Sequence, residues 1–184
     1  AVDELKSEEF ADLYADNAEG HRDTGSEYVR ETYIESDLEL MFPPTYIPND
    51  SERISLYREL DNMEEERDIL AFTERLKDRF GKIPKEGKEL IRIVRLRRMA
   101  KKLGMEKVVL KKGQMSLFLV NNPDSPYYQS EAFGKLLGFI QKHPRECNLR
   151  EQNGKRSIVI KNVPTVEAAC GYLKEMEKIN STDF

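Results

Sequence analysis

The chain has 184 residues, which at roughly 100 to 200 residues per domain predicts one domain, or one domain with an appendage, and excludes a large multidomain machine. Residues 1–48 hold 13 acidic and 3 basic residues, a net charge of −10, whereas residues 49–184 hold the other 21 acidic and 27 basic residues, a net charge of +6. This asymmetry predicts a charged tether on a globular body that meets an anionic surface or an acidic partner.

No membrane or secretory role is predicted. The first residues lack an apolar segment behind a positively charged start, so we expect no signal peptide and a cytoplasmic location. Uninterrupted apolar stretches such as 117–120 are far shorter than the ~20 residues of a membrane helix. Cys147 and Cys170 are too few for a disulfide framework or a zinc cage. The chain begins with Ala, which suggests a piece of a longer protein.

The N-terminal 48 residues are predicted to be a connector. They are rich in acids, their apolar residues follow no regular period, and the stretch ends in a proline-rich segment, 42–48. A segment of this composition buries too little apolar surface to offset the entropy cost of ordering its backbone. We therefore expect an acidic, largely flexible connector over 1–48 and a domain over 49–184.

Three helices are predicted between 49 and 104. Asn49 and Asn62, each followed three residues later by a glutamate, predict capped starts for the first two. The second helix, about 63–80, carries an apolar stripe that predicts one buried face. The third, about 84–103, begins at Pro84 and stops at Gly104.

The third helix also carries a candidate binding surface. Its apolar residues cluster on one face and its bases lie opposite, where they could contact phosphates or an acidic partner. The alternative is a solvated face, and no aromatic residues interleave with these bases to stack on nucleotides. The candidate residues are Arg95, Arg98, Lys101 and Lys102.

Residues 105–184 contain two similar β-β-α units. At an offset of 41 residues, Gly113 corresponds to Gly154 and Ser116 to Ser157. Each hairpin alone is marginal and needs neighbours and a covering helix. The fold class predicted is α/β (α+β): a three-helix subdomain over 49–104, beside a small four-stranded, mostly antiparallel sheet over 105–184 with two helices on one face.

The chain offers little for catalysis. No phosphate-binding glycine loop, dinucleotide-binding motif or nucleophile elbow is present, and His143 with Cys147 is too sparse for a metal site. We expect a non-enzymatic chain with no catalytic residues, no cofactor and no metal.

Four segments in this order and spacing resemble the C-terminal domain of bacterial transcription-repair coupling factor. They are Tyr46–Asn49, Arg53–Arg58, Leu76–Pro84, and Ile93–Arg97 together with Ala100–Gly104. The acidic stretch before them is similar to the connector that follows the family's motor module. The resemblance is strongest over about 46–110.

The resemblance implies a role inside a larger protein, an ATP-dependent double-stranded DNA translocase whose ATP and Mg belong to the motor and not to this domain. The terminal domain is expected to cover an excinuclease-B-like module of the same chain, which binds the excinuclease A protein, and to restrain the motor until RNA polymerase is engaged. The alternative, from another class, is an autonomous nucleic-acid-binding module that uses the basic third helix.

The resemblance also implies a contact surface. In the family, acidic residues on the helix that ends in Asp-Arg-Phe-Gly face arginines of the excinuclease-B-like module. Asp78 keeps one acidic position. Arg75 stands where a second acid is expected, with Glu74 beside it. We expect Asp78, Glu74 and Arg75 to form the contact, or Asp78 to support only the helix end.

Overall fold

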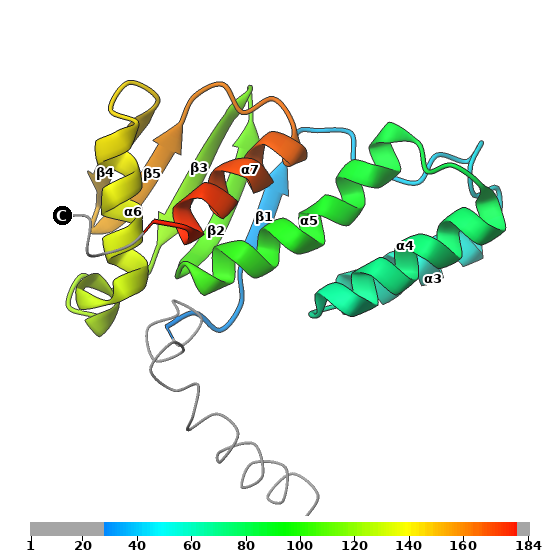
Figure 1. The fold of residues 1–184 in the computed structure, drawn as a ribbon, viewed down its shortest axis with the longest axis horizontal. Coiled ribbons are helices and arrows are strands. Elements are labelled where there is room, and N and C mark those ends of the chain that lie inside the picture. The colour runs from blue at the N-terminus through cyan, green and yellow to red at the C-terminus, as the bar shows by residue number, and fades with distance from the viewer. Residues whose placement is uncertain (1–27, 180–184) are drawn as a thin grey trace, which may run out of the picture.

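The computed structural model describes residues 28–179, which form an α+β fold (Figure 1). The elements, in chain order, are β1 (Tyr33–Ser36), α3 (Asp50–Asp61), α4 (Glu66–Phe80), α5 (Lys85–Lys102), β2 (Met105–Lys111), β3 (Gln114–Leu119), the 3-10 helix η2 (Pro126–Gln129), α6 (Glu131–Lys142), β4 (Cys147–Gln152), β5 (Lys155–Ile160) and α7 (Val166–Glu177). No helix within these residues is long and apolar enough to cross a bilayer.

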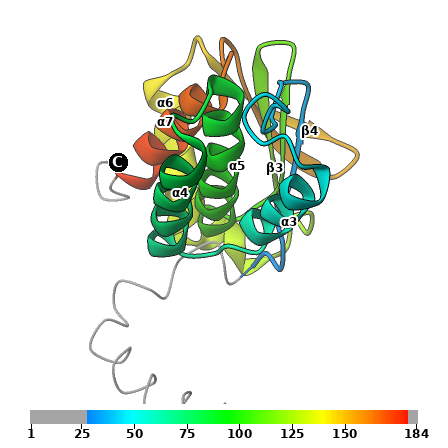
Figure 2. The same cartoon turned by 90° about the vertical axis from the view of Figure 1, so that its right-hand side faces the viewer.

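The sheet has five strands in the order β1-β2-β3-β5-β4. β1 runs parallel to β2 and the other pairs are antiparallel, so the predicted mostly antiparallel sheet is confirmed, with one strand more than expected. Both hairpins turn on two residues with positive φ, Lys112-Gly113 and Asn153-Gly154, which suits the right-handed twist of the strands. Helices α5, α6 and α7 lie on one side of the sheet (Figures 1 and 2).

The prediction of a connector over 1–48 is wrong for residues 28–48. β1 pairs with β2, Val29 is buried in the same core as the inner strands, and Phe42 and Ile47 are fully buried. These apolar residues show no period because they serve a single short strand and two different hydrophobic clusters. The ordered domain therefore begins no later than residue 28, and the prediction for residues 1–27 lies outside the described residues.

Two hydrophobic clusters stabilise the fold, and helix α5 contributes to both. The sheet cluster lies between the sheet and α5, α6 and α7, and includes Leu96 and Leu117. The helical cluster joins α3 and α4 to the N-terminal half of α5; its buried members are Phe42, Ile47, Leu60, Ile69, Phe72, Leu76, Ile83, Ile91 and Val94. The predicted three-helix part is therefore present with a hydrophobic cluster of its own, and its third helix, α5, also belongs to the sheet layer.

One of the two predicted helix caps is present. The N–H of Glu52 donates to Oδ1 of Asn49 (2.9 Å), as the sequence predicts for the start of α3. Asn62 instead ends α3, because its side-chain amide donates to the Arg58 carbonyl (2.9 Å). Helix α4 consequently begins at Glu66 rather than near 63.

Candidate functional site

Helix α4 separates its residues into a buried and an outer face. Ile69, Phe72 and Leu76 point into the helical cluster. The α4 outer face, defined by Leu70, Glu74, Arg75 and Asp78, is exposed along its length. Leu70, Glu74 and Asp78 follow one another at spacings of four residues and so share one line on the helix. The structure thus brings the three predicted contact residues together on one exposed surface, and adds Leu70, which is 52% exposed.

The charges on the α4 outer face differ in how they are held. Arg75 forms an ion pair with Glu59 of α3, and its guanidinium lies 5.7 Å from the centre of the Phe72 ring. Glu74 Oε1 lies 3.3 Å from Nζ of Lys77. Asp78 forms no ion pair within residues 28–179. Exposed ion pairs contribute little to stability, so Glu74 and Arg75 can both exchange partners at small cost, and Arg75 differs in that its guanidinium also lies over the Phe72 ring.

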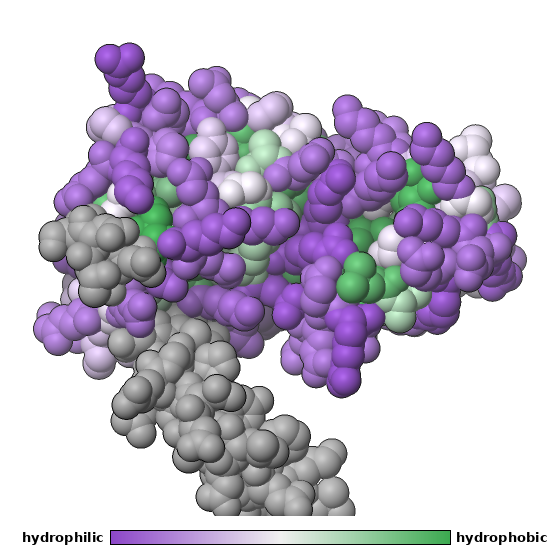
Figure 3. Space-filling view, in the orientation of Figure 1, coloured by the Kyte–Doolittle hydropathy of each residue, from purple (hydrophilic) through white to green (hydrophobic). Residues whose placement is uncertain are grey.

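The basic face of α5 is largely engaged within the molecule. Nε of Arg95 lies 2.9 Å from Oε1 of Glu66 on α4, and Nη1 of Arg98 lies 3.3 Å from Oε2 of the same carboxylate. Nη1 of Arg97 lies 2.8 Å from Oδ1 of Asp61. These arginines fasten α3 and α4 to α5, and Figure 3 shows hydrophilic side chains gathered over that junction.

The two lysines of the predicted basic surface lie at the end of α5, beside Arg98. Lys101 and Lys102 line a groove of about 650 Å³ between the end of α5, the α3–α4 turn and Arg30. Asp61 and Glu64 line the same groove, so its positive charge is partly compensated. Arg98 lines this groove as well, so three of the four candidate residues lie together and Arg95 lies outside the groove. The sequence carries no local signal for the pairing of Arg95 and Arg98 with Glu66, because Glu66 is 29 and 32 residues away.

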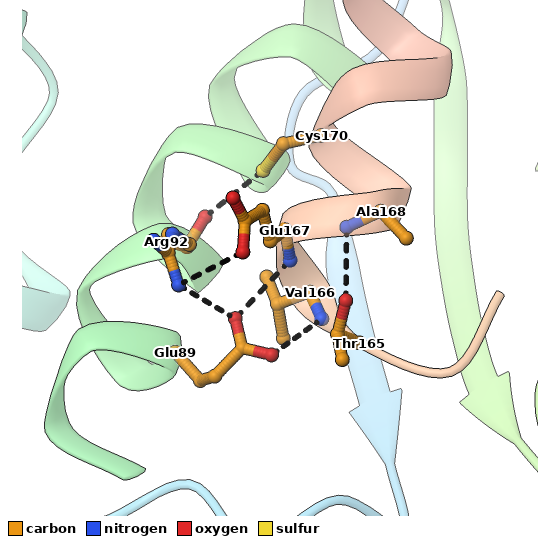
Figure 4. A network of polar contacts seen from close by, with 7 residues as sticks. All are labelled: Glu89, Arg92, Thr165, Val166, Glu167, Ala168 and Cys170. Atoms are coloured by element: carbon orange, nitrogen blue, oxygen red, sulfur yellow. Dashed lines mark hydrogen bonds and ion pairs between the residues drawn. The ribbon is translucent and has the colours of Figure 1, made fainter. Parts of the chain in front are cut away.

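A buried carboxylate joins α5 to α7 (Figure 4). The N–H groups of Val166 and Glu167, at the start of α7, donate to Oε1 and Oε2 of Glu89 at 3.0 and 3.1 Å. Nη1 of Arg92 lies 3.3 Å from Oε2 of Glu89 and 3.8 Å from Oε2 of Glu167. A carboxylate at a helix N-terminus satisfies N–H groups that have no partner in the helix. Glu89 is thus a structural residue that sequence reasoning missed.

The cysteine and histidine side chains of the described residues are buried or paired with other residues. Burial raises the pKa of the Cys147 and Cys170 thiols to about 11, which makes both poor nucleophiles. Nε2 of His143 lies 2.6 Å from Oε1 of Glu175. Within residues 28–179 no group of three or more His, Cys, Asp and Glu side chains could hold a metal ion. The α4 outer face and the α5 groove are suited to binding.

Known proteins of one family are similar to this chain. The family model described as the TRCF domain matches residues 36–130, which is 95 of the 184 residues. The transcription-repair-coupling factor of Escherichia coli K12 is 30% identical over 121 residues, 65% of this chain and 10% of that protein. The corresponding factor of Rickettsia prowazekii is 26% identical over 135 residues, 72% of this chain and 11% of that protein. The chain spans about a tenth of the length of these relatives.

A solved structure has the same fold. The crystal structure of a C-terminal domain of transcription-repair coupling factor superposes with a TM-score of 0.65 and covers 84% of this chain and 96% of that one, at 15% sequence identity. The family model covers just over half of the chain, including β2, β3 and helices α3, α4 and α5. The chain therefore belongs to the TRCF domain family.

Proposed function

We propose that this chain is a non-catalytic regulatory domain of a transcription-repair coupling factor and acts in transcription-coupled DNA repair. In this proposal it covers the surface on which an excinuclease-B-like module of the same protein binds the excinuclease A protein. It thereby restrains the motor until RNA polymerase is engaged. The observation that carries the proposal is the α4 outer face, an exposed line of two carboxylates and one leucine on a helix anchored by its other face.

The chemistry of the α4 outer face favours a basic partner surface. Asp78 and Glu74 lie one turn apart, and each carboxylate can accept two parallel hydrogen bonds from one arginine guanidinium, which is a strong form of ion pair. Leu70, one further turn away, offers apolar area beside the charges. Such a contact is weak by itself, but a tethered partner is present at an effective concentration in the millimolar range. A weak contact is also the kind that polymerase engagement can displace.

Arg75 has a supporting place in this proposal. Its ion pair with Glu59 directs the guanidinium towards α3, so that it does not stand between a partner arginine and Asp78. The contact then relies mainly on Asp78, with Glu74 as the second acceptor.

The first experiment removes the domain from its parent protein. The deletion should begin at residue 28, because a deletion from residue 49 would leave β1, Phe42 and Ile47 behind without their partners. We expect tighter binding of the excinuclease A protein and faster ATP hydrolysis. Unchanged binding and unchanged ATPase activity would contradict the proposal.

The second experiment reverses one charge. Asp78→Arg places a cation opposite the expected arginines, so the affinity of the parent for the excinuclease A protein should rise about tenfold, equivalent to about 1.4 kcal/mol. Asp124→Arg is the matched control, since Asp124 is exposed on the loop between β3 and η2, and this loop lies on the opposite side of the fold from α4 (Figure 1). Equal effects of the two variants would indicate a general charge effect and not a contact at α4.

A further inference from the structure

The sheet has a second face that carries a row of side chains from all five strands. The strand registers align Tyr33 of β1 with Lys107 of β2, Lys107 with Phe118 of β3, Phe118 with Ser157 of β5, and Ser157 with Arg150 of β4. Residues aligned across neighbouring strands project from the same face of a sheet. Along this line an aromatic ring, a cation, a second aromatic ring, a serine and a second cation follow one another.

This row lies opposite the helices. Side chains alternate between the faces of a strand, and Val108, Leu117 and Ile158, each adjacent to a row residue, are fully buried in the sheet cluster. Phe118 is only half-buried and belongs to neither hydrophobic cluster of residues 28–179. Helices α5, α6 and α7 all lie on the other side (Figure 2). We call this surface the open sheet face and define it by Tyr33, Lys107, Lys111, Phe118, Arg150 and Ser157.

The open sheet face is positively charged. Glu35 holds Nζ of Lys107 at 2.9 Å and Nζ of Lys111 at 3.4 Å, so both ammonium groups are fixed beside the row at the side of Tyr33. Arg150 is exposed at the other edge. Three cations therefore face two carboxylates, Glu35 and Glu31, and the second of these accepts a hydrogen bond from the Tyr33 hydroxyl at 3.1 Å. Tyr33 is 62% exposed, which leaves most of its ring available to a ligand.

This composition discriminates between two kinds of partner. The core of a protein interface is depleted in lysine and glutamate, yet here lysine lies between the two rings. Single-stranded nucleic acid, by contrast, is bound by aromatic rings that stack on bases and by cations that follow the phosphates. A sheet with helices on one side and aromatic rings on the other is a known platform for unpaired bases. Duplex DNA keeps its bases stacked and cannot offer their faces to Tyr33.

We propose that the open sheet face binds single-stranded nucleic acid, with Tyr33 and Phe118 stacking on bases and Lys107, Lys111 and Arg150 contacting phosphates. The site is separate from the α4 outer face and does not depend on the regulatory contact proposed above. Each stacked base contributes about 1–3 kcal/mol, so two rings and three cations support a salt-sensitive affinity without sequence preference.

The test uses the whole chain and two labelled oligonucleotides, oligo-dT and oligo-rU of about 12 nucleotides, in fluorescence anisotropy at low salt. We expect binding that weakens as salt increases. Tyr33→Ala should weaken it about 5- to 100-fold, since it removes one stacking ring. Phe118→Leu keeps apolar volume in the sheet and should also weaken binding. Leu149→Ala is the control, because Leu149 is exposed on the same edge strand as Arg150 but projects with Ile158 to the helix side.

A second measurement reports on phosphate contacts. Arg150→Glu should weaken binding. It should also reduce the slope of log binding constant against log salt concentration by about one. Arg145→Glu, on an exposed loop, should change neither the affinity nor this slope. Circular dichroism of each variant checks that the fold is retained.

Three results would overturn the proposal. One is no binding of either oligonucleotide at low salt. Another is duplex DNA binding that depends on Lys101 and Lys102 and not on Tyr33, which would assign nucleic acid to the α5 groove. The third is binding of an oligo-glutamate peptide as tight as that of oligo-dT and unaffected by Tyr33→Ala, which would identify an acidic protein partner instead.

Discussion

The sheet cluster and the helical cluster share helix α5 but differ in how they are stabilised. The sheet cluster contains 25 buried residues, mostly aliphatic, enclosed between a five-stranded sheet and three helices. The helical cluster contains nine among residues 28–179, and aromatic rings meet in it. The ring centre of Phe42 lies 5.4 Å from that of Tyr57, with the rings nearly parallel, and 6.4 Å from that of Phe72, with the rings tilted by 36°. Arginine pairs at its border supplement this small core.

The difference has a physical reason. A small group of residues buries a lower fraction of its surface than a large one, so it gains less from hydrophobic burial. The helical cluster compensates by packing against α5, which the sheet cluster holds in place. We therefore expect α3 and α4 to open more readily than the sheet, and α5 to follow the sheet.

Phe72→Ala should give the largest difference in stability between the two clusters. Removing this fully buried ring from a core of nine residues should destabilise α3 and α4 by about 3–5 kcal/mol. Hydrogen exchange should become faster in these two helices while β3 and β5 stay protected. Leu117→Ala in the sheet cluster is the counterpart and should accelerate exchange throughout. If both variants accelerate exchange everywhere, the two clusters unfold as one unit.

The next effect concerns the junction of α5 and β2. Gly104 has φ = 78° and a Cβ there would overlap the ring of Tyr127, whose hydroxyl donates to the Leu103 carbonyl at 2.7 Å. Gly104→Ala should lower the free energy of unfolding by about 2–4 kcal/mol, as the sum of overpacking and backbone strain. Gly113→Ala isolates the strain, since Gly113 has φ = 70° and open space around it. Thermal unfolding of both variants measures the difference, and equal losses would refute the overpacking.

A smaller effect is expected at the α5–α7 contact. Glu89→Ala removes the acceptor of two N–H groups at the start of α7 and should cost about 1–3 kcal/mol. Glu89→Gln keeps one acceptor oxygen and should cost less. Glu86→Ala, one turn earlier on α5, serves as the control in urea unfolding. A loss at Glu86 as large as that at Glu89 would mean that helix propensity, and not the cap, is responsible.

The weakest coupling is expected at the border of the helical cluster. A double-mutant cycle of Arg97→Ala and Asp61→Ala should give a coupling energy below about 1 kcal/mol, because the Asp61 side chain is 74% exposed. The coupling should shrink further in high salt. A larger coupling would show that ion pairs, and not ring packing, hold the helical cluster to α5.

Much of the fold could be predicted from local patterns. Gly113 and Gly154 mark the two hairpins, and the apolar stripe of α4 predicts its buried face. The same stripe places Glu74 and Asp78 outward, so the exposure of the candidate contact was predictable too. The partner of Arg75 was not, because Glu59 lies on another helix and 16 residues away.

Strand β1 escaped prediction for a similar reason. Its four residues alternate between exposed and half-exposed positions and carry no strong apolar pattern. Its stability comes from the edge of β2, which aligns Tyr33 with a residue 74 positions later, Lys107. Asn62 shows the opposite error. Its local pattern predicts a cap at the start of α4, but its side chain instead donates to the Arg58 carbonyl at the end of α3.

Apart from β1 and η2, the element types follow from the amino-acid sequence alone, as do the hairpin turns, the amphipathic faces and the charge asymmetry between residues 1–48 and 49–184. They depend on backbone geometry and side-chain period, which act within a few residues. Tertiary packing determines which charged side chains form ion pairs and which aromatic rings lie beside cations. The arginines of α5 became internal partners of Glu66 and Asp61, while Tyr33, Lys107, Phe118 and Arg150 were aligned on one face. Such contacts depend on strand register and helix packing between distant segments, which no local pattern encodes.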